Sequence, residues 1–248
     1  SPTRTLAAAT SDTIIILDNN PSRTADIFVR QLTGNGSVVD ISDARFPPVA
    51  RFLHAAIAVG NVDIAENDDF ANLVLGNQPY GDLSAEINLT AGSNDYTWTA
   101  AGNQGAIVLD STETIPTGFY TTLALVGKAT AHDAMNIIST RRPVSTHGQL
   151  SFIQAAANFD TVDIYILTPG QTVADVNAAS PNVPFKFTTG VTPVRANDYR
   201  IAVTTRGEKT VLAGPLDLPI ANGDVVEVFL LDTADPNTVS ILVNRIAP

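Results

Sequence analysis

The chain repeats one stretch of its own sequence after a spacing of 100 residues. The first copy covers residues 51–56 (RFLHAA) and 62–64 (VDI), and the second covers residues 151–156 (SFIQAA) and 162–164 (VDI). Six positions are identical, with no gap between the copies. Such internal similarity is the signature of a duplicated structural unit, so we expect both copies to fold alike.

The similarity continues well beyond this stretch. Residues 94–96 (NDY) return as residues 197–199, and the apolar run 123–126 corresponds to the run 228–231. The offset grows from 100 to about 105, as insertions in surface loops allow. The chain is therefore a tandem duplication.

Short apolar runs separated by Gly, Asn and Pro follow one another through both copies, and no convincing amphipathic helix appears. Residues 96–99 (YTWT) alternate as a half-buried strand does. Many short strands in about a hundred residues are typical of a β-sandwich. We therefore predict an all-β protein with two tandem immunoglobulin-like antiparallel β-sandwich domains, repeat 1 in residues 46–143 and repeat 2 in residues 148–248.

Residues 1–45 form a short N-terminal β extension in this prediction, with a disordered lead-in over residues 1–11. Its expected strands are residues 13–17, 26–30 and 38–41. Three roles stay open: completing the first sandwich, forming a partial third repeat, or pairing with another chain. Apolar strands with unpaired edges promote association, so self-association through these strands is one expectation.

The charge and composition of the chain disfavour some kinds of binding partner. The net charge is −11 with only three lysines, which disfavours nucleic acid and anionic membranes. The chain has no cysteine and no apolar run long enough to cross a membrane. It opens on Ser1 rather than Met, so we expect a processed or trimmed start, with any signal peptide or lipid anchor upstream of residue 1.

The repeated stretch resembles the bacterial repeat family known as domain of unknown function 4397. Members of that family carry a strand ending in His-Ala-Ser-Pro and then a Val-Asp-Ile/Val-Tyr strand. Residues 52–55 (FLHA) with 62–64 match it in repeat 1, and residues 152–155 (FIQA) with 162–165 (VDIY) match it in repeat 2.

The Gly-x-x-Tyr element of that family is similar to residues 118–121 (GFYT), and the resemblance covers residues 49–248. Neither copy has the Ser-Pro, and Gln154 stands where the family has histidine. The resemblance implies immunoglobulin-like sandwiches in exported bacterial proteins, often lipoproteins or surface proteins. It implies no known activity.

The three histidines do not suggest a catalytic group. His54 lies in a predicted strand and corresponds to Gln154. A position that accepts both residues needs a hydrogen bond more than a proton shuttle. His132 and His147 fall in predicted loops with no metal-ligand spacing, and no serine sits in a nucleophile elbow.

Several acidic positions allow two interpretations. Asp63 and Asp163 could each be half of a catalytic pair, but such an aspartate more often accepts backbone N–H bonds or faces solvent. Residues 66–69 (ENDD) could offer oxygen ligands to calcium, yet they lack the order of a calcium loop and indicate a solvated loop. Asp232 with residues 235–237 (DPN) is a weaker candidate of the same kind.

Tyr96 and Trp98 share one face of a predicted strand. They could form a sugar-stacking platform, but the threonines between them look like the outward face, so we place both rings in the core. Arg141 and Arg142 are the only adjacent basic pair, which is too little for a phosphate site.

These observations predict a non-catalytic, exported bacterial protein in the periplasm, on the outer membrane or outside the cell. It would act as an interaction or structural module toward a protein or a cell-surface glycan. The alternatives are a carbohydrate-binding module, which requires exposed aromatic rings, and a carboxylate-dependent hydrolase, which requires two close carboxyl groups in a cleft. We assign no catalytic, cofactor-binding or metal-binding residue.

Overall fold

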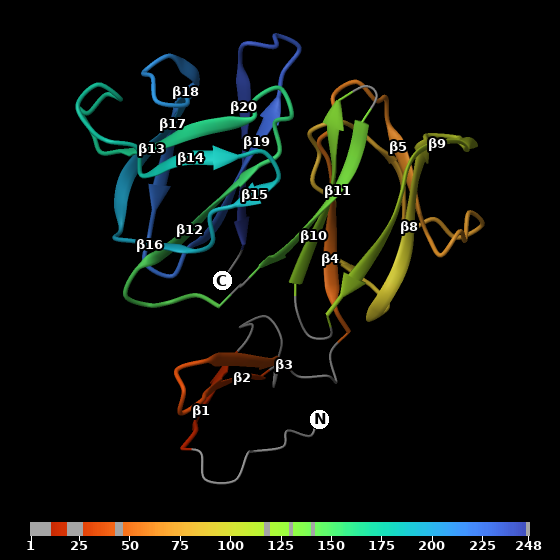
Figure 1. Ribbon diagram of the computed structural model, residues 1–248, viewed down its shortest axis with the longest axis horizontal. Coiled ribbons are helices and arrows are strands. Elements are labelled where there is room, and N and C mark those ends of the chain that lie inside the picture. The colour runs from red at the N-terminus through yellow and green to blue at the C-terminus, as the bar shows by residue number, and fades with distance from the viewer. Residues whose placement is uncertain are drawn as a thin grey trace.

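The computed structural model describes residues 11–18, 27–42, 47–116, 120–128, 131–139 and 142–246 (Figure 1). Within these ranges the chain forms twenty β-strands and no helix, as the all-β prediction requires. The described residues accordingly contain no helix that could cross a membrane. The predicted lead-in falls almost wholly outside the described residues, as does Arg141.

Repeat 1 consists of two four-stranded sheets, in the orders β11-β10-β4-β7 and β6-β5-β8-β9. Successive side chains point to opposite faces of a strand, and one face of β4 and of β10 packs into the core between these two sheets. The strands are β4 (Val49–His54), β5 (Val62–Glu66), β6 (Leu75–Gln78), β7 (Ile87–Asn88), β8 (Gly92–Ala100), β9 (Asn103–Ile115), β10 (Tyr120–Lys128) and β11 (Ala131–Ser139).

Repeat 2 has the same arrangement. One sheet runs β15-β12-β19-β20, with β16 also paired to β12, and the other runs β14-β13-β17-β18. The strands are β12 (Gly148–Gln154), β13 (Thr161–Leu167), β14 (Ser180–Pro184), β15 (Phe187–Thr188), β16 (Thr192–Val194), β17 (Asn197–Thr205), β18 (Val211–Ile220), β19 (Val225–Asp232) and β20 (Val239–Ile246).

One strand pair in each repeat differs from the predicted antiparallel pairing. β4 runs parallel to β10, with Phe52 opposite Leu123, and β12 runs parallel to β19, with Phe152 opposite Val228. A parallel pair needs a crossover connection rather than a hairpin. Here the crossover is the second sheet of the same repeat.

In each repeat the two sheets face each other across their own apolar core. In repeat 1 that core contains Phe52, Trp98 and Leu123, and in repeat 2 it contains Phe152 and Val228. The identical residues of the duplication thus occupy equivalent core positions. This explains why the repeat was visible in the sequence.

A third apolar cluster joins the two repeats. It brings the outer face of the β4/β10/β11 sheet against the outer face of the β12/β19/β20 sheet, so the four sheets form successive layers (Figure 1). Fully buried members come from both sides, among them Leu53, Ala124, Ile153 and Phe229. No pattern in the sequence predicted this shared core.

The N-terminal extension forms a separate antiparallel sheet in the order β1-β2-β3. Its strands, β1 (Thr13–Asp18), β2 (Ile27–Leu32) and β3 (Val38–Ser42), lie close to the predicted positions. In Figure 1 this sheet lies below the two repeats. Among the described residues none of its strands pairs with a strand of either repeat.

The contact between the repeats predicts a large loss of stability when its largest fully buried side chain is removed. Phe229 is fully buried there, so Phe229→Ala should lower the free energy of unfolding by about 3–5 kcal/mol. Urea denaturation followed by circular dichroism measures this change.

Ile107→Ala serves as the matched control. Ile107 is 61% exposed, so its truncation should change the free energy of unfolding by about 0.5 kcal/mol or less. Equal effects of the two substitutions would contradict the shared core.

Candidate functional site

The carboxylate of Asp63, on β5, is occupied by the backbone of two neighbouring segments. The residue is 9% exposed. Its Oδ1 accepts the backbone N–H of Asn77 at 2.7 Å, and its Oδ2 accepts that of Gly102 at 2.7 Å. These bonds lie where the register between β5 and β6 shifts, so the carboxylate holds an irregular strand pair together.

Asp163 repeats this arrangement on β13. Its two oxygens accept the backbone N–H groups of Asn182 at 2.7 Å and Gly207 at 2.8 Å. Asn77 and Asn182 both have left-handed backbone angles, with φ of 55° and 56°, a conformation that asparagine tolerates better than most residues. The predicted acceptance of backbone N–H bonds is therefore confirmed for both aspartates.

His54 and Gln154 also have one role in common. The ring Nε2 of His54 lies 2.9 Å from the carbonyl oxygen of Gly60 and donates to it. Gln154 Nε2 donates to the carbonyl of Phe159 at 3.1 Å, in the equivalent loop. Both side chains are fully buried. The position requires a hydrogen bond to the loop, as the His/Gln exchange predicted.

Burial lowers the pKa of His54, and the neighbouring His132 lowers it further. The bond to the Gly60 carbonyl raises this pKa and offsets part of the decrease. His132 Nε2 is buried and finds no hydrogen-bond partner among the described residues. His147 is remote from both in sequence and contacts the Thr146 hydroxyl at 3.1 Å. No group of three potential metal ligands gathers anywhere in the described ranges.

The carboxylates of residues 66–69, at the end of β5 and in the loop after it, bond to different partners. Glu66 accepts the Tyr96 hydroxyl at 2.9 Å, Asp68 accepts the Thr97 hydroxyl at 2.9 Å, and Asp69 bonds within its own turn. Burial, together with Glu66, raises the pKa of Tyr96. The carboxylates are thus distributed along the loop.

The carboxylate of Asp232, at the end of β19, accepts two backbone N–H bonds, as those of Asp63 and Asp163 do. The residue is 2% exposed and accepts the backbone N–H groups of Ala157 and Asn158, both at 2.9 Å. Burial raises the pKa of Asp232. Asp235 accepts the backbone N–H of Asn237 at 2.9 Å.

Tyr96 and Trp98 lie in the core of repeat 1, as the sequence predicted. They are 0% and 1% exposed and pack against Phe52, with ring centroids 5.9 and 5.8 Å apart. These two rings therefore cannot stack on a sugar. The aromatic platform that the carbohydrate-binding alternative needs does not form here.

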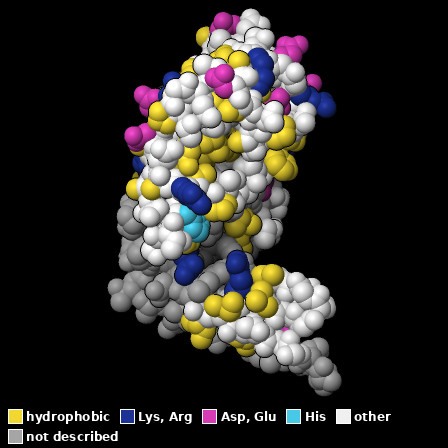
Figure 2. Space-filling view, turned by 90° about the vertical axis from the view of Figure 1, so that its left-hand side faces the viewer, with side chains coloured by type: hydrophobic (Ala, Val, Ile, Leu, Met, Phe, Trp, Pro, Cys, Tyr) yellow, Lys and Arg dark blue, Asp and Glu magenta, His cyan; other side chains and the backbone are white. Residues whose placement is uncertain are grey.

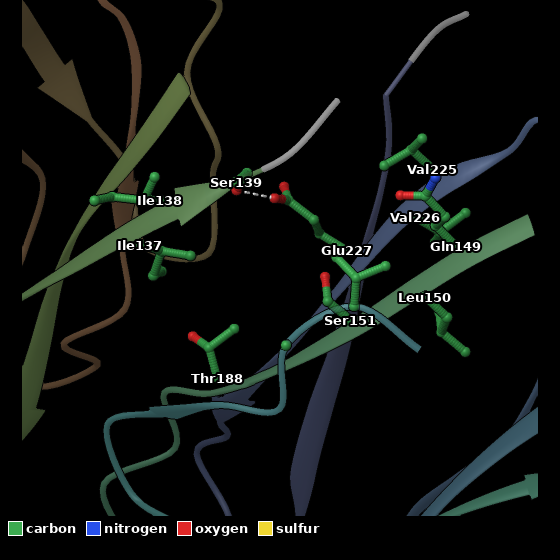
Figure 3. A pocket seen from close by; sticks show the side chains of 12 residues that line it. Ile137, Ile138, Ser139, Gln149, Leu150, Ser151, Thr188, Val225, Val226 and Glu227 are labelled. Carbon is green, nitrogen blue, oxygen red and sulfur yellow. Dashed lines mark hydrogen bonds between the residues drawn. The ribbon is translucent and has the colours of Figure 1, made fainter. Parts of the chain in front are cut away.

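A network of polar side chains lies at the junction of the repeats. Arg51 Nη1 donates to Asn244 Oδ1 at 2.7 Å, and Asn244 Nδ2 donates to Glu227 Oε2 at 2.9 Å. The Ser139 hydroxyl donates to the other oxygen of Glu227 (Figure 3). Arg51 also forms an ion pair with Glu86 at 3.2 Å. We call this network the junction network.

A pocket of about 40 Å³ lies beside the junction network. Figure 3 shows Ser151 and Thr188 on the repeat 2 side and Ile137 and Ile138 on the facing strand of repeat 1. Glu227 lines it and is only 3% exposed. The pocket therefore combines apolar walls with a buried carboxylate, and it exists only where the two repeats meet.

Two further contacts hold the opposite end of the junction. The Tyr80 hydroxyl donates to the carbonyl oxygen of Asp232 at 2.7 Å, and Lys186 forms an ion pair with Asp133. Burial raises the pKa of Tyr80, and the nearby Asp232 raises it further. Both ends of the junction are thus bridged, which fixes the pocket walls relative to each other.

Comparison with known proteins gives a family match over part of the chain. Residues 49–165 match the family model described as domain of unknown function (DUF4397). The chain contains a DUF4397 domain. The match takes in every strand of repeat 1, then β12 and most of β13 in repeat 2, so the resemblance predicted for residues 49–248 is confirmed for residues 49–165. No curated protein matches the chain.

We call the two backbone N–H bonds that Asp63 and Asp163 each accept the aspartate clamp. The clamp at Asp63 lies inside the DUF4397 domain, and so does the clamp at Asp163. The junction network was not identified from the sequence. Its residues differ between the copies, so a search for identical positions passes over them. The exchange of Arg51 for Ser151 was the signal that could have revealed it.

Removing the charge of the clamp should destabilise the DUF4397 domain. Asp63→Asn keeps the shape of the side chain, but its amide can accept only one of the two backbone N–H bonds. Hydrogen bonds to a charged acceptor contribute about 1.5–3 kcal/mol, so a loss of that order is expected in urea denaturation. Asp198→Asn, at an exposed position, should change stability little, and a comparable loss there would contradict the clamp.

The buried His54 predicts a pH dependence of stability. Its pKa is lowered on folding, so the unfolded chain binds the proton more tightly. The contribution of neutral His54 is fully present above the unfolded pKa of about 6.5 and is lost as pH falls below that value toward the folded pKa. His54→Gln, which introduces the residue found at position 154, should keep the hydrogen bond and remove this component. Chemical denaturation at several pH values checks the difference between the two proteins, and parallel curves would contradict the assignment.

Proposed function

We propose that the chain is a non-catalytic, exported bacterial protein that acts through interaction with another polypeptide, in the first instance a second copy of itself. We also propose that each repeat is an immunoglobulin-like sandwich and that the protein works in the periplasm or at the cell surface. The observation that carries the interaction is the exposed apolar edge of the N-terminal sheet.

Strand β1 presents isoleucine to water. Ile14 and Ile16 are 55% and 67% exposed, and they share one face because side chains alternate along a strand. Val38 on β3 is 54% exposed. Figure 2 shows hydrophobic side chains at the surface of this sheet, below the repeats.

The free edge of β1 supports pairing with another strand. β1 pairs with β2 on one side, and no described strand pairs with it on the other. An exposed, apolar edge strand is a template for β-augmentation. Residues 13–17 (TIIIL) carry no charge, so two such strands can pair antiparallel without like charges facing each other across most of their length.

The polar residues of the repeats support a non-catalytic role. Both repeated aspartates and the buried histidine are engaged in hydrogen bonds to backbone groups. Such bonds stabilise the fold, and in both aspartates they engage the two carboxylate oxygens.

Association through β1 predicts a change of mass on a single substitution. Wild-type chain at about 50 μM should give the mass of a dimer in light scattering after gel filtration, a concentration at which a micromolar interface is populated. Ile16→Lys should give a monomer, because a lysine at the edge opposes strand pairing.

Ile107→Lys is the control for a lysine at another exposed apolar position, on β9 of repeat 1. It should leave the dimer intact. A monomeric wild-type chain, or a dimer that persists in Ile16→Lys, would contradict association through this edge.

A further inference from the structure

The pocket at the junction occupies a position that is filled in the other half of the molecule. In repeat 1, Arg51 on β4 lies opposite Thr122 on β10. In repeat 2, Ser151 on β12 lies opposite Glu227 on β19. Both pairs follow from the same register, because β4 corresponds to β12 and β10 to β19. Ser151 is thus the counterpart of Arg51.

The surroundings of the two positions also correspond. In repeat 1, Ile87 lies opposite Ala50, and Glu86 is the residue before it. In repeat 2, Thr192 lies opposite Leu150, and Val191 is the residue before it. Val191 is therefore the counterpart of Glu86, and it lines the pocket.

The strand of the other repeat completes each site. Asn244 lies opposite Glu227, and Ile137 lies opposite Thr122, so Ile137 is the counterpart of Asn244. Arg51 donates a hydrogen bond to Asn244 across the junction. At the corresponding place in repeat 2, Ile137 and Ser151 both line the pocket. The pocket is the vacant equivalent of the space that the Arg51 side chain fills.

The charges of the two positions differ in an informative way. Arg51 is paired with Glu86. Glu227 is 97% buried, because only 3% of it is exposed, and it accepts bonds from the neutral groups of Ser139 and Asn244. Within the described residues no ion pair reaches Glu227. A buried carboxylate without a direct cation partner is costly, and Arg51 reaches Glu227 only through the Asn244 amide.

We propose that the pocket binds the guanidinium group of an arginine side chain from a partner polypeptide, with its charge against Glu227. The walls suit that ligand. Ile137 and Val191 would contact the methylene stem, and the exposed Ile138 lies at the rim. Guanidinium is planar and weakly hydrated, which makes it the cation of choice for a buried carboxylate. A volume of about 40 Å³ has room for about three water molecules, close to the size of this head group.

The inference deepens the proposed interaction function and rests on it in taking the ligand to be part of a polypeptide. The pocket and the β1 edge are separate surfaces. Ile16→Lys should therefore abolish self-association and leave guanidinium binding unchanged, so the failure of one proposal is distinguishable from the failure of the other.

Titration of the full chain with methylguanidinium, followed by amide NMR, tests the pocket directly. The amides of Ser151, Gly190 and Glu227 should shift in a saturable way. Methylurea has the same shape without the charge and should leave them in place. Glu227→Gln should weaken methylguanidinium binding at least about tenfold, the loss of a charge-assisted bond. Equal responses to both probes, or an unchanged response in Glu227→Gln, would overturn the proposal.

A second pair of variants supplies the cation from within the chain. Ser151→Arg should restore the arrangement seen at Arg51 and raise the melting temperature above that of Ser151→Met, a matched long side chain without charge. Ser151→Arg should also abolish the amide shifts caused by methylguanidinium. When Glu227→Gln is added to both variants, the difference in melting temperature between Ser151→Arg and Ser151→Met should disappear. A lower melting temperature for Ser151→Arg than for Ser151→Met would overturn the proposal.

A short peptide with one central arginine distinguishes a polypeptide ligand from a free guanidine. Contacts of its neighbouring residues with Ile138 and Val191 should make it bind more tightly than methylguanidinium. A peptide in which citrulline replaces arginine is the control and should not bind. Binding of the arginine peptide no tighter than that of methylguanidinium would overturn the assignment to a polypeptide.

Discussion

The apolar contact between the two repeats determines the rest of the structure. Each repeat already has a core between its own two sheets, yet it presents a second apolar face on the outside. Leu53 and Ile153 occupy equivalent positions on these faces, and both are completely buried. The same patch serves on both sides, as in an isologous dimer interface. The junction network and the pocket exist because these two faces meet.

The duplication has kept the paired backbone bonds of Asp63 and Asp163, on β5 and β13, and has changed the residues at the contact between the repeats. The aspartate that accepts two backbone N–H groups is present in both copies, since each copy needs it to hold an irregular strand pair. By contrast, Arg51 and Glu227 have the counterparts Ser151 and Thr122. Pairing two copies in one chain removes the need for both to carry the same residues at their contact. A nearly symmetric interface can then have one filled site and one vacant site.

Much of the fold could be predicted from the sequence because it follows from local patterns. The duplication located the two units, and alternation and turn residues predicted strands and placed Trp98 in the core. Comparison of the copies predicted a hydrogen-bonding role for His54, because Gln154 can replace a donor but not a proton shuttle.

The rest depends on long-range arrangement that no local pattern specifies. The parallel pairing of β4 with β10 joins segments that are far apart, and the shared core joins faces of two different repeats. Glu227 lies in an apolar run that predicts only a buried strand. Its surroundings include Ser139 from the other repeat, which only the folded chain brings near.

The parallel pairing has a consequence for the growing chain. The first strand of each repeat finds its neighbour in the sheet only about 70 residues later, and contacts of such long range form slowly. Repeat 1 cannot assemble its β4/β10/β11 sheet until nearly its whole length has been synthesised. Its outer face then has no cover until β19 has followed. From the end of β11 to the end of β19, about two fifths of its synthesis, the nascent protein therefore carries an exposed apolar surface. The strands made last are the ones that cover it.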